Sequence, residues 1–64
     1  MLTKHKSNFA VYTQWVGREG FHCLVEECNT EVEAFSKALL YQWPDTRVIV
    51  VDKNGSILKQ HICN

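Results

Sequence analysis

Only one segment of the sequence, residues 29–44, has the pattern of an amphipathic helix. Thr30 followed by Glu33 forms a capping box, and acidic residues in the first turn suit the positive end of the helix dipole. A proline ends the segment, because it disfavours helical geometry at the residue before it. Ala34 and Tyr41 are expected on the solvent-facing side of the helix. At helical spacing, the residues expected to face the core are Val32, Phe35, Leu39 and Trp43.

Strand patterns flank this helix on both sides and predict two hairpins. Residues 9–16 and 21–28 are rich in β-branched and aromatic side chains, and a turn bounded by glycines joins them. Residues 46–63 hold two apolar runs on either side of an Asn-Gly dipeptide at positions 54–55, which predicts a two-residue type I′ turn. The element order is therefore ββαββ.

This element order predicts an α+β fold class. One helix covers only one face of a sheet, and a right-handed crossover then favours a four-stranded antiparallel sheet in the order 2-1-3-4. At 64 residues the chain has room for one domain with a small core. We expect that domain to span residues 9–64, after a disordered N-terminal tail at residues 1–8.

The face of the sheet away from the helix is expected to be open. The hairpin register places Ile49, Val51 and Leu58 on one face, and we expect these under the helix. The other face would then expose apolar side chains, and such patches often mark partner sites. The candidate partner-binding residues, on this face or on the solvent side of the helix, are Tyr12, Tyr41, Arg47, Val48, Val50, Lys59 and His61.

The charges balance in number but not in position. The chain has seven acidic and seven basic residues, yet most of the acids lie between residues 19 and 33 and most of the bases follow them. Such polarity suits steering toward a charged protein surface, and the alternative is a pair of solvated faces with no partner. The residues of the candidate acidic contact edge are Glu19, Glu26, Glu27, Glu31 and Glu33.

The cysteines and histidines do not have the spacing of a metal site. His22 and Cys23 are strand neighbours, so they should point to opposite faces, and Cys23 and Cys28 also have opposite parity. No zinc-ligand spacing is present, so we expect no metal and reduced thiols, with Cys23 as a small buried hydrophobic residue.

Catalysis is not indicated either. No glycine-rich loop suits a phosphate group, and a single helix on a small sheet leaves little room for a substrate cleft. We therefore expect no cofactor, no catalytic residue and no enzymatic activity. The sequence also has no signal peptide and no apolar run long enough to span a membrane, so a cytoplasmic protein is expected.

Several short stretches resemble a known family. Phe9-Ala10, "TEVEA" at residues 30–34, Trp43 and Thr46-Arg47-Val48 are similar to the small RNA polymerase inhibitor of short-tailed lytic coliphages, over residues 9–50. In that family an arginine pair on the last strand and an acidic strip contact the polymerase and its DNA channel. Arg47 matches one of these arginines, and the second has no counterpart here. The resemblance implies a small phage host-takeover protein that binds and blocks a host protein.

Three functional hypotheses follow. The first is a non-enzymatic protein-binding module, most simply a phage-type inhibitor of a host protein in transcription or defence. The second is a weak RNA- or DNA-binding module that uses Tyr12, Arg47, Lys59 and His61, although a net charge of zero disfavours nucleic acid. The third is a homodimer formed through a face or an edge of the sheet.

Overall fold

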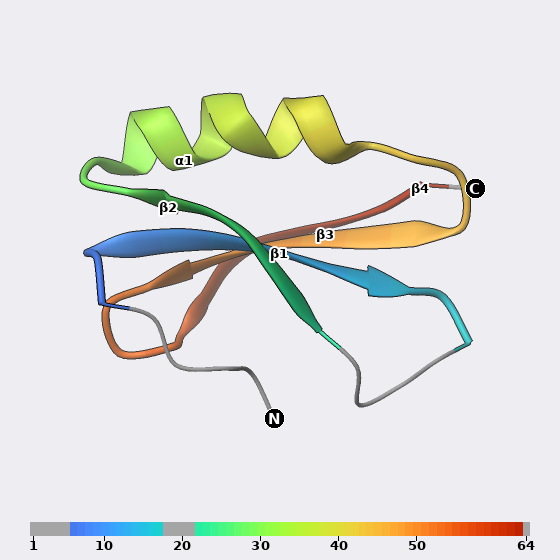
Figure 1. Ribbon diagram of the computed structural model, residues 1–64, viewed down its shortest axis with the longest axis horizontal. Helices are drawn as coiled ribbons and strands as arrows, with labels where there is room; N and C mark the ends of the chain where they lie inside the picture. Colours follow the sequence, from blue (N-terminus) through green and yellow to red (C-terminus); the bar gives the residue numbers. More distant parts are fainter. Residues whose placement is uncertain (1–5, 18–21, 64) are drawn as a thin grey trace.

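One antiparallel sheet and one helix make up the fold (Figure 1). The computed structural model describes residues 6–17 and 22–63. The strand order is β2-β1-β3-β4, so the predicted α+β class and sheet order are confirmed. The elements are β1 (Phe9–Trp15), β2 (Cys23–Cys28), α1 (Glu31–Ala38), the 3₁₀ helix η1 (Leu39–Tyr41), β3 (Thr46–Asp52) and β4 (Ile57–Cys63).

The helix begins where the sequence predicts and ends earlier. Thr30 is the N-cap, and its hydroxyl accepts a hydrogen bond of 3.2 Å from the backbone N–H of Glu33. After η1, Gln42 has φ −83° and ψ 72°, and the N–H of Trp43 donates to the carbonyl of Tyr41 at 2.9 Å. This is the geometry of an inverse γ-turn, which stops the helix before Trp43.

The helix contacts the sheet through small residues. Ala34 and Ala38 are buried, whereas Phe35 and Tyr41 are half-buried on either side of them. The predicted core face is therefore wrong, because three of its four large residues point away from the sheet. Alanine side chains let the helix axis come close to the sheet, and the large apolar residues on other sides of the helix are left exposed.

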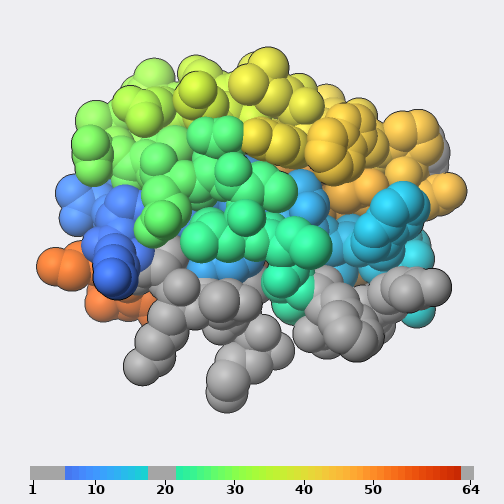
Figure 2. Space-filling view, viewed as in Figure 1, coloured from blue at the N-terminus to red at the C-terminus, as the bar shows by residue number. Residues whose placement is uncertain are grey.

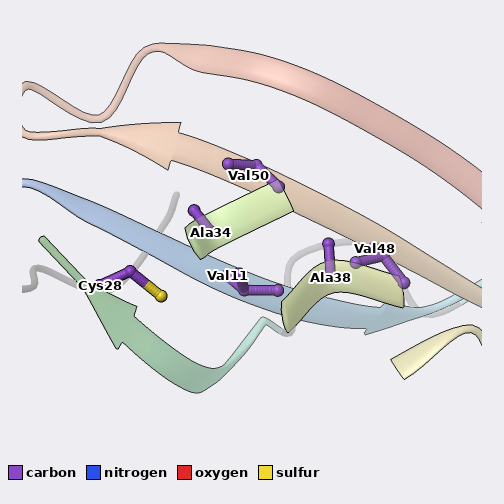
Figure 3. Packing of buried hydrophobic residues seen from close by; sticks show 6 residues of the cluster. All are labelled: Val11, Cys28, Ala34, Ala38, Val48 and Val50. Atoms are coloured by element: carbon purple, nitrogen blue, oxygen red, sulfur yellow. The ribbon is translucent and has the colours of Figure 1, made fainter. Parts of the chain in front are cut away.

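The face of β3 that meets the helix is also opposite to the prediction. Val48 and Val50 are only 3% and 1% exposed, and they pack with Val11, Cys28 and the two alanines beneath α1 (Figure 3). Strand alternation predicts which residues share a face, but it does not predict which face the helix covers. On the other face, a second buried cluster contains Ala10, Tyr12, Ile49 and Val51.

A bulge shifts the register of β4. Val50 pairs with Lys59 as predicted, and Val48 pairs with His61. One step further along, Val51 pairs with Ile57 rather than with the predicted Leu58, so β4 carries an extra residue there.

A second bulge lies in β2. Val11 pairs with Glu26, but Tyr12 pairs with Leu24, so Val25 is the extra residue. Glu26 therefore lies on the helix side and not beside Leu24 as predicted. The same shift brings Cys23 and Cys28 onto one face, so their predicted opposite parity is wrong.

The turn between β3 and β4 has three residues instead of two. The N–H of Gly55 donates to the carbonyl of Asp52 at 3.1 Å, and Gly55 has φ +85°. Asn54 does not have the positive φ that a type I′ turn requires. The carboxylate of Asp52 accepts hydrogen bonds of 2.9 Å from the N–H groups of Asn54 and Ser56, which stabilises this turn.

The segment before β1 is hydrogen-bonded to β2. The N–H of Lys6 donates to Glu27 Oε1 at 3.0 Å, and the side chain of Asn8 donates to the carbonyl of Asn29 at 3.5 Å. Of the expected N-terminal tail, residues 1–5 lie outside the described residues, as does most of the expected turn at 17–20. Within the described ranges, no helix is long and apolar enough to cross a membrane.

Candidate protein-binding surface

Three of the predicted partner-binding residues lie in the core. Val48 and Val50 are buried beneath the helix, and Tyr12 is fully buried on the opposite face of the sheet. Burial raises the pKa of the Tyr12 hydroxyl, and the negative charge of Glu27 raises it further. None of these three side chains is exposed to a partner while the chain is folded.

The predicted basic residues do not share one surface. Lys59 and His61 pair with Val50 and Val48, so they lie on the helix side of the sheet. Arg47 pairs with Gln14 and Ile62 on the other face, and its Nη1 donates to Gln14 Oε1 at 3.2 Å. The sheet therefore separates Arg47 from Lys59 and His61.

Tyr41 has a structural partner that the sequence does not reveal. Its hydroxyl donates a short hydrogen bond to Glu26 of β2, and its ring meets Trp43 edge-on at 5.6 Å between centroids. The hydrogen bond to Glu26 is the main cause that raises the pKa of Tyr41, and burial adds to it. The expectation that Tyr41 points into solvent is wrong, because the bulge in β2 brings Glu26 beneath it.

The predicted acidic edge is partly used within the chain. Glu27 accepts hydrogen bonds from the N–H and hydroxyl of Ser7 as well as from Lys6, and Glu26 accepts from Tyr41. Glu31 and Glu33 are exposed at the helix start, and Glu19 lies outside the described residues.

Four large apolar side chains on the helix and in the residues just after it are exposed. We name Val32, Leu39, Leu40 and Trp43 the helix ridge; they are 76%, 62%, 64% and 52% exposed. Sequence reasoning assigned three of them to the core and did not consider Leu40. The signal that could have found the ridge is the alanine pair at positions 34 and 38, which offers a second apolar face one turn apart.

Contacts on either side of the helix show how it is oriented. The ammonium of Lys59 in β4 lies 5.5 Å from the centre of the Phe35 ring, so Phe35 is on the β4 side. Tyr41 bonds to Glu26 of β2, so it is on the β2 side. Val32 and Leu39 are three and four residues from Phe35 in helical spacing, which places this part of the ridge above the β4 side of the sheet.

More exposed apolar residues lie beyond the end of the helix. Trp15 is 60% exposed at the end of β1, and the N–H of Val16 donates to the carbonyl of Asp45 at 2.9 Å. This bond holds the end of β1 beside the chain that follows Trp43. Figure 2 shows the cyan end of β1 directly below the yellow and orange atoms of that chain.

The described residues do not gather into a group of three or more His, Cys, Asp or Glu side chains that could hold a metal ion. Cys28 is buried, and burial raises the pKa of its thiol, with a further rise from the charges of Glu33 and Glu26. A thiol with a raised pKa stays protonated and is a poor nucleophile. Cys23 is exposed, so the expectation that it is buried is wrong.

Comparisons with known protein families, with characterised proteins and with solved structures find no match to this chain.

Proposed function

We propose that this chain is a small non-enzymatic protein-binding module that recognises its partner through the helix ridge. The observation that carries the proposal is the exposure of four large apolar side chains on the helix and in the residues just after it. Large exposed apolar patches on soluble proteins often mark sites of interaction with another protein.

The free energy available from this surface is substantial. Full burial of one large apolar side chain contributes about 1.5–3 kcal/mol. Each ridge residue is between half and three-quarters exposed, so burying all four would contribute on the order of 5 kcal/mol before the cost of association. Tryptophan is also enriched among the residues that dominate interface energies, and Trp43 belongs to the ridge.

The resemblance to phage polymerase inhibitors supplies the first class of partner to test. We propose that the chain docks on a host protein of transcription or defence and blocks it. Glu26 and Glu33 near β2, and Lys59 on β4, place charges of both signs around the helix, which suits orientation on a charged protein surface.

The placement of the basic residues disfavours nucleic-acid binding. Sheet-based RNA readers stack bases on exposed aromatic rings of one sheet face. Here Tyr12 is buried, and Arg47 lies on the face opposite to Lys59 and His61. The four residues of that hypothesis cannot contact one strand of nucleic acid together.

Direct binding to purified bacterial RNA polymerase tests the proposal first, and affinity capture from a bacterial lysate extends it to other host proteins. Each assay compares the wild type with Leu39→Lys, which places a charge in the middle of the ridge. The matched control is Asn29→Lys, an exposed polar residue next to β2 that receives the same charge. Circular dichroism checks that both variants are folded.

A partner bound by the wild type and by Asn29→Lys, but at least about tenfold more weakly by Leu39→Lys, supports the ridge as the docking surface. A partner bound equally by all three contradicts it. Equal loss of binding in both variants would indicate a general charge effect rather than a specific apolar contact.

A further inference from the structure

We infer that β4 pairs with β4 of a second copy of this chain, so that two four-stranded sheets join into one continuous antiparallel sheet. Within the described residues, β4 is an edge strand that pairs only with β3. Its outer side therefore presents unpaired backbone N–H and C=O groups, as any sheet edge does. This surface is distinct from the helix ridge, and the inference goes beyond the proposed function.

The two edges of the sheet differ in how they are protected. On β2, two adjacent glutamates, a bulge in mid-strand and hydrogen bonds from residues 6 and 7 all discourage pairing with another strand. On β4, the bulge lies at the turn end, and the one charged residue is Lys59. The ammonium of Lys59 lies 5.5 Å from the centre of the Phe35 ring of its own chain, on the helix side of the sheet.

The sequence of β4 is complementary to itself. In an antiparallel pair centred on Gln60, the middle residue of Ile57–Cys63, Leu58 lies opposite Ile62 of the partner copy, and this pair occurs twice. Gln60 and Ile62 pair with Ile49 and Arg47 on the face away from the helix, whereas Leu58 is the extra residue of the bulge and has no partner in β3. Both apolar side chains are partly exposed in a single copy, so the pairing would cover them.

The charges also permit this pairing. The same centre places Lys59 opposite His61 of the partner copy rather than opposite another lysine. The chain has no net charge, so two copies do not repel each other as a whole. A domain of 64 residues has a small core, and chains of this size commonly gain stability from association.

Sedimentation equilibrium tests the inference on the intact chain, whose mass of 7.4 kDa should double as concentration rises. Gln60→Lys places two lysines opposite each other at the twofold axis and should weaken the dimer by more than about tenfold. His61→Glu places an acid opposite each partner Lys59 and should tighten the dimer roughly fivefold. Asn29→Lys, beside the opposite edge of the sheet, should leave the dissociation constant unchanged.

A weaker dimer for Gln60→Lys, a tighter dimer for His61→Glu and an unchanged dissociation constant for Asn29→Lys would establish the β4 pairing. A chain that stays monomeric up to about 1 mM overturns it, because a dimer with a dissociation constant of that order would be half formed there. A dimer whose dissociation constant is the same in both β4 variants as in the wild type also overturns the inference, since another surface must then hold the copies together. If Leu39→Lys rather than Gln60→Lys dissolves the dimer, the ridge is the self-association surface, which refutes the β4 inference and leaves the host-partner proposal to its own binding assay.

Discussion

The orientation of the helix can be tested by comparing two substitutions to alanine. Val50 is 1% exposed beneath α1, and Leu39 is 62% exposed on the ridge. Replacing Val50 removes two methyl groups at about 0.8 kcal/mol each, and the cavity left behind raises the cost to about 2–3 kcal/mol. Replacing a fully buried leucine costs about 2–5 kcal/mol, but only about two-fifths of Leu39 is covered.

An exposed site leaves no cavity, so the lower end of that range applies, and two-fifths of it gives a cost of about 0.8 kcal/mol for Leu39→Ala. The better helix propensity of alanine reduces this cost by about 0.2 kcal/mol. In a domain of this size, 1 kcal/mol changes the melting temperature by roughly 4–8 °C. We expect Val50→Ala to lower it by at least about 8 °C and Leu39→Ala by less than about 6 °C.

Urea unfolding followed by circular dichroism measures both free energies of unfolding. An unchanged dependence of the free energy on urea concentration shows that each variant exposes the same surface area when it unfolds. The reasoning is refuted if Leu39→Ala is the more destabilising of the two. That result would mean that the helix turns its large residues toward the sheet, as the spacing of Val32, Phe35 and Leu39 alone predicts.

Three further predictions concern the cap, the pH dependence and the thiols. Thr30→Ala should cost about 1 kcal/mol of unfolding free energy, because the first turn loses the bond from Thr30 Oγ1; an unchanged melting curve would argue against this cap. The pKa of Tyr41 is raised above its ordinary value of 10.0, so its contribution to stability is complete below pH 10 and is lost as pH rises further. The melting temperature of Tyr41→Phe should therefore fall less than that of the wild type as pH rises above 10. An equal fall in the two proteins would contradict the hydrogen bond to Glu26. Alkylation of the folded chain, mapped by mass spectrometry, should modify exposed Cys23 well before buried Cys28, and equal rates would count against the packing of Cys28 under the helix.

Local signals predicted a large part of this fold. The capping box predicted where the helix starts, and the strand patterns predicted two hairpins and the sheet order. The pairing of Val50 with Lys59 was predicted correctly although the turn was not, because the bulge in β4 compensates for the extra turn residue. Apart from the sheet order, which follows from the handedness of the crossover, these features depend on residues close together in sequence.

The candidate surface could not be predicted, because two segments are apolar on more than one side. Residues 48–51 form an unbroken apolar run, so either parity of β3 could face the helix. The helix likewise offers an alanine face and a face of larger residues, and only the packed structure distinguishes them. An error in either choice exchanges the residues expected in the core with those expected on the surface.

The packing of Ala34 and Ala38 against the sheet has a consequence for how such a chain can change over generations. The two alanines belong to the buried core, while the ridge side chains are 52–76% exposed. Most substitutions destabilise a protein, and a binding site made of core residues would lose stability each time its specificity changed. Under the proposed function, the residues used for recognition are separate from those buried beneath the helix. A lineage of such chains could replace Val32, Leu39 or Leu40 and acquire a new target with the same scaffold.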